Sequence, residues 1–257
     1  LNIPNDIDVA FYLIHSMSTQ IGDFENMEEI CATNFKNCIE KTNAKQVIYL
    51  SGISNAEDLS KHLSSRKNVE SILSGSNFAL TTLKAGIIVG SGSASFEIIR
   101  DLVEKLPIMI TPRWLKTKCQ PIAIRNVVEF LIGVIGRQDT YNQSYDIGGP
   151  DILTYKEMLM RFAKVRKLKR RIFIVPIMTP KLSSYWLYFV TSTSYALAQN
   201  LVNSMKIEVI CKPNNLADLL GITYIDYDSS IRLAFDKISQ NQVLSSWKDA
   251  QTSDIFS

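Results

Sequence analysis

Short apolar runs alternate with amphipathic segments along the first part of the chain. The runs are Val9–Ile14, Gln46–Leu50 and Phe78–Leu83. Each is continuously apolar or rich in β-branched and aromatic residues, which is typical of strands buried on both faces. Between the runs, apolar residues recur with a helical period and predict helices over about 24–42 and 59–73. This order predicts a parallel sheet with helices on its faces, joined by right-handed crossovers.

The later part of the chain changes character near residue 150. Helical periods predict helices over 95–105 and 126–135, and a short strand over 145–147 ends at a Gly-Gly-Pro turn. Thr154 and Glu157 then form a capping-box pattern that starts another helix. From Arg171 onward a strand, an apolar helical stretch and an irregular tail follow. We therefore expect an α/β domain over 1–150 and a smaller, mainly helical lobe over 151–257.

The composition is that of an ordinary soluble domain. The 257 residues are 46% hydrophobic and 21% charged, and the formal net charge of +3 is too small to imply nucleic acid or an anionic membrane as the partner. The segment 182–205 carries no charge, but its many Ser, Thr, Asn and Gln residues favour a buried or interface-facing lobe over a membrane span. No signal peptide opens the chain, so we expect a cytoplasmic protein without a transmembrane segment.

The four cysteines form no CxxC pair, and no zinc-ligand spacing exists. Cys31 and Cys38 lie on the predicted apolar face of the helix over 24–42. We expect them to be buried, reduced thiols rather than a disulfide.

A Gly-rich phosphate-binding turn is not evident in the sequence. The nearest candidate, Val89–Ser95, has two glycines after a predicted strand but lacks the third, and no acidic residue follows about twenty positions on. We interpret it as a loop whose serines cap the following helix, and expect the phosphate-binding unit to precede Leu1.

Five segments, in the right order, resemble landmarks of the short-chain dehydrogenase/reductase superfamily. Asp8–Ser16 resembles the strand whose exit contacts the nicotinamide-side ribose, and Gln46–Gly52 resembles the strand that ends in the catalytic Ser or Thr. His62–Glu70 (HLSSRKNVE) has the frame of the YxxSKxxxE helix. Leu83–Gly90 is similar to LRPGxxYG, and Tyr145–Thr154 (YDIGGPDILT) is similar to YNIGGPxxLT. The closest resemblance is to the atypical, NmrA-like and epimerase-like NAD(P)-binding members.

The resemblance implies a doubly wound, Rossmann-like sheet that is incomplete at its N-terminus, with a C-terminal substrate lobe and NAD or NADP as cofactor. Some members of this family carry a further C-terminal domain, so the resemblance allows one in the full-length protein. The catalytic positions carried over are Ser51, His62 and Arg66. The implied cofactor contacts are Ile14, His15, Ser16, Leu50, Ser51, Arg66, Lys84, Ala85, Gly86, Ile87 and Ile88.

The chemistry of this superfamily needs a Tyr and a Lys four residues apart on one helix. None of the ten tyrosines is followed by Lys at the fourth position; His62 and Arg66 stand at that spacing instead. His62 could exchange protons near neutral pH, and Arg66 could hold a ribose or phosphate. Equally, the pair could serve binding alone or remain from a lost active site. Ser51 could orient a carbonyl or merely cap the strand end, and His15 could contact the ribose or be a polar loop residue.

Two functions therefore stay open. One is a reductase or epimerase acting on a small carbonyl or sugar compound, and the other is a non-catalytic NAD(P)-sensing or scaffold module. A nucleic-acid partner is not expected, because its main indication is the basic run Lys164–Arg171, which is more typical of a solvated helix end.

Overall fold

The computed structural model describes residues 3–14, 24–53, 61–75, 77–175, 203, 205–240 and 243, with the backbone alone at 24, 25 and 61–65. These residues form two compact units that interleave along the chain. The first unit comprises Leu1–Ala85, Asn126–Ile147 and Cys211–Thr223; the second comprises Gly86–Arg125, Gly148–Ile210 and Tyr224–Ser257. The division at residue 150 into a cofactor domain and a substrate lobe is functional, and it stays a prediction.

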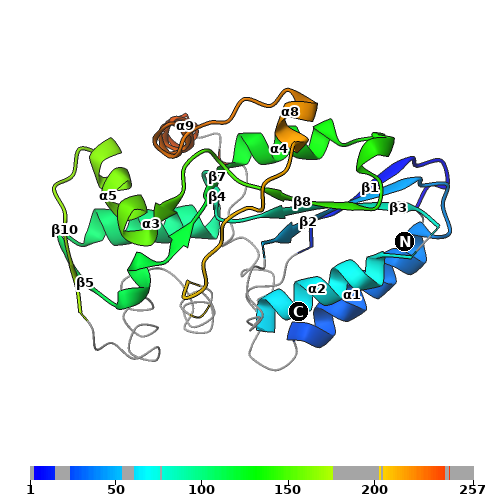
Figure 1. Cartoon of the computed structure of the whole chain (residues 1–257), viewed down its shortest axis with the longest axis horizontal. Helices are drawn as coiled ribbons and strands as arrows, with labels where there is room; N and C mark the ends of the chain where they lie inside the picture. Colours follow the sequence, from blue (N-terminus) through cyan, green and yellow to red (C-terminus); the bar gives the residue numbers. More distant parts are fainter. Residues whose placement is uncertain are drawn as a thin grey trace. The chain divides into compact units, whose positions relative to one another are not determined.

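A four-stranded sheet forms the centre of the first unit (Figure 1). Its strands, in spatial order, are β1 (Val9–Tyr12), β2 (Gln46–Gly52), β3 (Ala79–Ala85) and β8 (Gln143–Ile147). All three pairings are parallel, which confirms the parallel sheet expected from the continuous apolar runs.

Helices cover both faces of this sheet. Figure 1 shows α1 (Phe24–Ile39) and α2 (Lys61–Leu73) together on one face, and α4 (Ile124–Gly133) and α8 (Leu216–Leu220) on the other. A short 3-10 helix, Gln138–Thr140, leads into β8. The core beneath α1 and α2 is apolar, with the Tyr12 ring edge-on to Phe35 and Tyr49. Its fully buried members include Ala32, Val47, Val69 and Leu73.

The burial of α1 differs from the sequence expectation. Cys38 is exposed and Cys31 is only partly buried, so the expectation of two buried thiols is wrong for Cys38, although both cysteines are free. Met27 and Ile30 are also exposed. The helix instead turns Glu28, Ala32, Phe35 and Ile39 inward. Apolar residues surround enough of this helix that its period alone does not decide which stripe meets the sheet.

A buried amide joins the sheet to the turn after α4. Gln46 is fully buried at the start of β2, and its Nε2 donates to Thr81 Oγ1 and to the Val134 carbonyl, each at 2.9 Å. Its Oε1 accepts from the Gly136 N–H at 2.8 Å. Gly136 has φ of +67°, a left-handed conformation that favours glycine at a helix end. Gln46 therefore ties a strand to a helix terminus through all its amide groups.

The second unit packs three helices around one apolar core: α3 (Ala94–Lys105), α5 (Tyr155–Val165) and α9 (Tyr227–Ser239). The rings of Phe96, Phe162 and Phe235 meet at its centre, with centroids 5.5–5.7 Å apart. At the start of α5 the predicted capping box is confirmed: Thr154 Oγ1 accepts from the Glu157 N–H, and the Glu157 carboxylate accepts from the Thr154 N–H.

Short paired strands complete the second unit. β4 (Ile88–Val89) pairs with β7 (Ile122–Ala123), and β6 (Lys118–Cys119) pairs with β9 (Leu153–Thr154). β5 (Ile108–Thr111) pairs in parallel with β10 (Arg171–Ile174), and the 3-10 helix Arg113–Lys116 follows β5.

Candidate functional site

The expected cofactor residues of the first unit lie where its parallel strands end. Ser51 of β2 is opposite Lys84 of β3, and Gly52 is opposite Ala85. Leu50 lies one residue earlier in β2, while Ile14 is exposed two residues beyond the end of β1. In open α/β sheets, ligands bind outside the carboxyl ends of the strands. Ile14, Leu50, Ser51, Lys84 and Ala85 therefore share the end at which this fold places a ligand.

Three of the expected residues are not covered at the level of side chains. His15 and Ser16 lie outside the described residues. His62 lies in α2, but only its backbone is described. Their roles stay predictions.

Ser51 is a buried hydroxyl at the end of β2. It points to the same face of the sheet as Tyr49, because the two residues are two positions apart in the strand and side chains alternate between the faces. Burial raises the pKa of Tyr49, and a hydrogen bond with Ser51 opposes that rise. Ser51 thus lies within β2, on the same face of the sheet as Tyr49.

Arg66 reaches from α2 to the end of β2. Its guanidinium lies against Gly52, in the space that a Cβ there would occupy. Burial lowers the pKa of Arg66, while the charges of Tyr49 and Glu28 raise it. The Tyr49 hydroxyl also donates to the Arg66 carbonyl at 3.4 Å. The structure therefore holds a guanidinium against Gly52, the residue that follows Ser51, at the ligand end of the sheet.

Glu28 was not among the residues singled out from the sequence. It comes from α1, is only 4% exposed, and is the carboxylate whose charge acts on Arg66. Its negative charge favours the charged form of the Arg66 guanidinium. Its spacing could have identified it, because Glu28 lies one helical turn before Ala32 on the buried face of α1.

Lys84 turns toward α2. Its Nζ lies 2.9 Å from Glu70 Oε2, and both side chains are about one-fifth exposed. The cation that stands in the place of the Arg in LRPGxxYG is therefore engaged with a helix on the same face of the sheet.

Gly86, Ile87 and Ile88 follow β3 directly and belong to the second unit. The Ile87 carbonyl accepts from the Ile122 N–H at 2.9 Å, and Ile88 opens β4. These contacts fix the backbone of the segment through β7, while Gly86 and Ile87 remain partly exposed.

The two-glycine segment Val89–Ser95 is a capped helix entry. Ser93 is the N-cap of α3, and its Oγ accepts from the Phe96 N–H and donates to the Ile88 carbonyl. A Cβ at Gly90 would collide with the side chain of Ile124. The preceding strand, β4, lies outside the four-stranded sheet. The segment therefore does not occupy the position of a dinucleotide-binding turn, which confirms its interpretation as a serine-capped loop.

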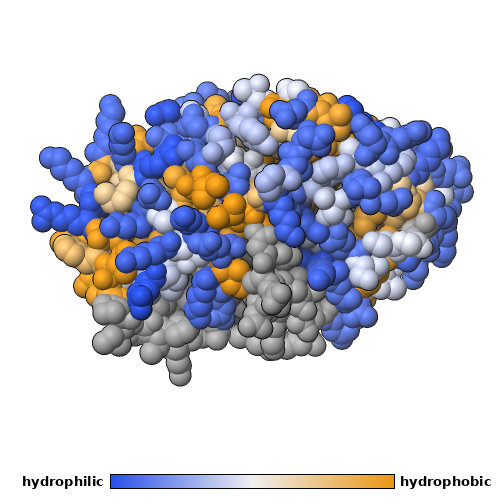
Figure 2. Space-filling view, in the orientation of Figure 1, coloured by the Kyte–Doolittle hydropathy of each residue, from blue (hydrophilic) through white to orange (hydrophobic). Residues whose placement is uncertain are grey.

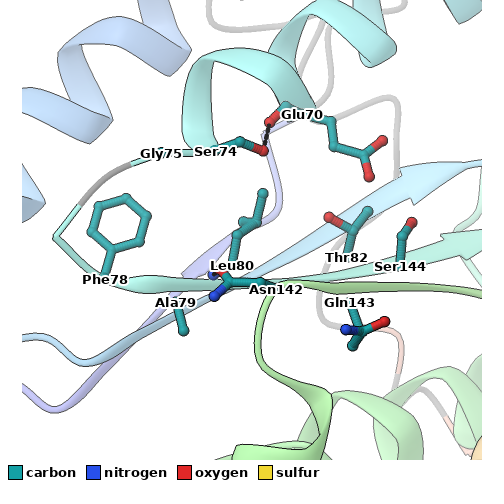
Figure 3. A pocket seen from close by; sticks show the side chains of 10 residues that line it. All are labelled: Glu70, Ser74, Gly75, Phe78, Ala79, Leu80, Thr82, Asn142, Gln143 and Ser144. Atoms are coloured by element: carbon teal, nitrogen blue, oxygen red, sulfur yellow. Dashed lines mark hydrogen bonds between the residues drawn. The ribbon is translucent and has the colours of Figure 1, made fainter.

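A pocket of about 530 Å³ opens beside α2 at the other end of the sheet (Figure 3). Its walls come from the end of α2, the start of β3 and the start of β8, and its lining includes Glu70, Phe78 and Asn142. Because β3 and β8 are parallel, this is the end of the sheet at which they begin. The pocket therefore opens toward the end at which the strands begin, while its lining residue Glu70 also pairs with Lys84 near the strand ends where the fold places a ligand.

Two further expectations concern metals and membranes. Among the described residues, no group of three or more His, Cys, Asp or Glu side chains is arranged to hold a metal ion. None of the described helices is both long enough and apolar enough to cross a bilayer.

Comparisons with known proteins identify the fold. No known protein family matches the sequence, and no curated protein matches it either. Among solved structures, a nucleoside-diphosphate-sugar epimerase from Staphylococcus aureus is similar at a TM-score of 0.68 and 12% identity, over 89% of this chain and 77% of that one.

Two similar structures contain nicotinamide cofactors. An NADPH-dependent quinone oxidoreductase from Escherichia coli, complexed with NADPH, has a TM-score of 0.68 and 14% identity over 90% of this chain and 77% of that one. UDP-glucuronic acid 4-epimerase from Bacillus cereus, in complex with NAD, has a TM-score of 0.64 and 10% identity over 92% and 76%. The chain therefore has the Rossmann-like fold of epimerases and reductases, and the resemblance seen in the sequence is confirmed at the level of fold.

Proposed function

We propose that this chain is an NAD(P)-binding protein of the epimerase/reductase type, with the nicotinamide side of the cofactor at the carboxyl ends of β1, β2 and β3. The observation that carries this proposal is that Ser51, its cross-strand partner Lys84 and Gly52, with the Arg66 guanidinium against it, all lie at that end of a parallel sheet. The fold shared with structures that hold NAD or NADPH supports it.

The hydrogen-bond donors at this end of the sheet, Ser51 and Arg66, suit the nicotinamide-side ribose of a dinucleotide. A serine hydroxyl and a guanidinium are groups that bind ribose hydroxyls and phosphate oxygens. The described residues contain no Gly-rich turn after a strand of the four-stranded sheet. Bound NAD(P) would supply the acceptor or donor of a hydride.

Each residue has a proposed task. Arg66 and Ser51 hold the ribose, and Ser51 also orients the substrate carbonyl. His62, at the frame position of the usual Tyr, exchanges the proton. Residues 1–150 serve the cofactor and 151–257 a small carbonyl or sugar substrate. The carboxylate of Glu28 keeps Arg66 in place, which makes Glu28 a positioning residue.

Binding is tested by titrating the full-length protein with NADH and NADPH and following the fluorescence of the reduced nicotinamide. We expect Ser51→Ala to weaken binding about fivefold to tenfold, as the loss of one hydrogen bond implies. Ser144→Ala is the matched control, because Ser144 is an exposed serine near the start of β8. Failure of both nucleotides to bind would contradict the proposal.

Chemistry is tested separately, by hydride transfer to a panel of carbonyl compounds and by epimerisation of nucleotide sugars. Turnover that His62→Ala abolishes, with cofactor binding retained, is the expected result. Cofactor binding without any turnover would restrict the function to an NAD(P)-sensing or scaffold module.

A further inference from the structure

The paired strands β5 and β10 present an apolar face to solvent. Ile108 and Ile110 of β5 are 56% and 54% exposed, and Phe173 of β10 is 55% exposed. Ile110 and Phe173 are direct cross-strand partners, so the three side chains form one continuous surface, here called the ribbon face. The alternate residues, Met109 and Ile172, pack into the core of the second unit. Figure 2 shows hydrophobic surface over these strands.

Basic residues lie on the ribbon face and in the segment that leads into β10. Arg171 lies opposite Ile108 and on the same side as Phe173, so a cation is part of the face itself. Lys164, Lys167 and Lys169 precede it in the same unit. All four are exposed, and within the described part of the chain none forms an ion pair. We call these four residues the basic cluster.

The local charge is much greater than that of the whole chain. Residues 101–116 and 164–175 contain nine basic side chains and two acidic ones, an excess of seven positive charges, whereas the net charge of the protein is +3. Both acids are already paired, Asp101 with Lys105 and Glu104 with Arg166, each at 3.1 Å. The Arg170 guanidinium is also already hydrogen-bonded, because it donates to the carbonyls of Val103 and Glu104. The basic cluster is therefore not neutralised locally.

We propose that the ribbon face and the basic cluster form a docking surface for an anionic membrane. Exposed apolar residues rimmed by cations match the two layers of such a surface, with phosphate headgroups outside and acyl chains beneath. Groups of four to eight Lys and Arg beside an apolar face bind acidic lipids.

Other occupants fit less well. A symmetric contact with a second copy would bring two strongly positive surfaces together, which like-charge repulsion opposes. Nucleic acid would satisfy the cations, but its phosphate backbone offers no counterpart to three large apolar side chains. The membrane surface complements both features at once.

Vesicle co-sedimentation tests this proposal, using vesicles of phosphatidylcholine with and without phosphatidylglycerol. The full chain should bind the anionic vesicles and not the neutral ones, and high salt should release it. The variant Lys169→Glu/Arg171→Glu should weaken binding at least about tenfold, because each surface cation contributes about 1 kcal/mol. Lys41→Glu, an exposed charge reversal in the first unit, is the matched control.

The apolar half is tested with Ile110→Ser/Phe173→Ser, and with Ile132→Ser, an exposed isoleucine of α4, as control. Far-UV circular dichroism checks the fold; if the apolar variant does not fold, the charge-reversal pair decides alone. The proposal is overturned by absent binding to anionic vesicles, by equal binding to neutral ones, or by binding that the charge reversals leave intact. Self-association lost in Ile110→Ser/Phe173→Ser, without vesicle binding, would assign the surface to a second copy instead.

Discussion

Replacing Gln46 with Met should destabilise the first unit more than its conservative size suggests. The substitution keeps the volume of a fully buried side chain but removes three hydrogen bonds, to Thr81, Val134 and Gly136. Thr81 Oγ1 retains the Thr140 carbonyl as a partner, and the Val134 carbonyl still accepts from another backbone N–H. The Gly136 N–H loses the acceptor that Gln46 provides.

The expected loss follows from these contacts. Three neutral hydrogen bonds at about 1 kcal/mol each give a loss of about 3 kcal/mol. A loss of 3 kcal/mol corresponds to a decrease in Tm of roughly 6–12 °C for a domain of this size. The substitution should lower the free energy of unfolding, since no new hydrogen bond replaces the lost ones.

Urea unfolding followed by far-UV circular dichroism measures the effect. The control is Gln143→Met, the same substitution at an exposed position of β8, which should change the free energy of unfolding by less than about 0.5 kcal/mol. Gln46→Glu is informative as well, because it keeps an acceptor for Gly136 but loses both amide donors. If Gln46→Met is no more destabilising than Gln143→Met, the reasoning about this buried amide is refuted.

Three other predictions follow from single contacts. Gly52→Ala should displace the Arg66 guanidinium and lower the free energy of unfolding by about 1–3 kcal/mol. The loss should be much smaller when Arg66 is already replaced by Ala. Equal losses in the two backgrounds of this double-mutant cycle would contradict the prediction. Thr154→Ala should cost about 1 kcal/mol at neutral pH by removing the cap of α5. Hydrogen bonds from Thr154 lower the pKa of Glu157, so its contribution is complete above the ordinary carboxyl pKa and is lost as pH falls through the lowered one. The loss in free energy of unfolding caused by Thr154→Ala, measured by urea unfolding, should therefore become smaller at acid pH. A loss that does not change with pH would contradict this reasoning. Arg161→Met should lower the free energy of unfolding by about 1–3 kcal/mol, because Arg161 loses ion pairs with Asp151 at 2.7 Å and Asp228 at 2.6 Å. An unchanged Tm would contradict a stabilising role for these ion pairs.

Local pattern was sufficient for the sheet and for the helix caps. Continuous apolar runs predicted β1, β2 and β3, and the structure extends the second of these through Ser51 to Gly52. The Thr154–Glu157 capping box was readable because both of its partners lie within one turn. Such features depend on neighbours in sequence, so no tertiary knowledge is needed to recognise them.

Contacts between distant segments were not readable in this way. The stripe of α1 that faces the sheet was assigned with Cys38 inward, and the structure exposes that residue. Gln46 looked like one polar residue at the edge of an apolar strand, yet its partners lie 35 to 90 residues away. The ribbon face was equally hidden, because Ile108 and Arg171 become neighbours only when β5 pairs with β10.

For the candidate site, the sequence by itself determined which residues stand at strand ends, and hence that Ser51 and Lys84 share one edge of a parallel sheet. Only the tertiary structure decided what surrounds them: Glu70 beside Lys84, and Glu28 and Gly52 beside Arg66. The physical reason is that the positions of the strands along the chain follow from the short-range hydrophobic pattern, whereas the partner of a buried charge depends on packing between elements far apart in the chain.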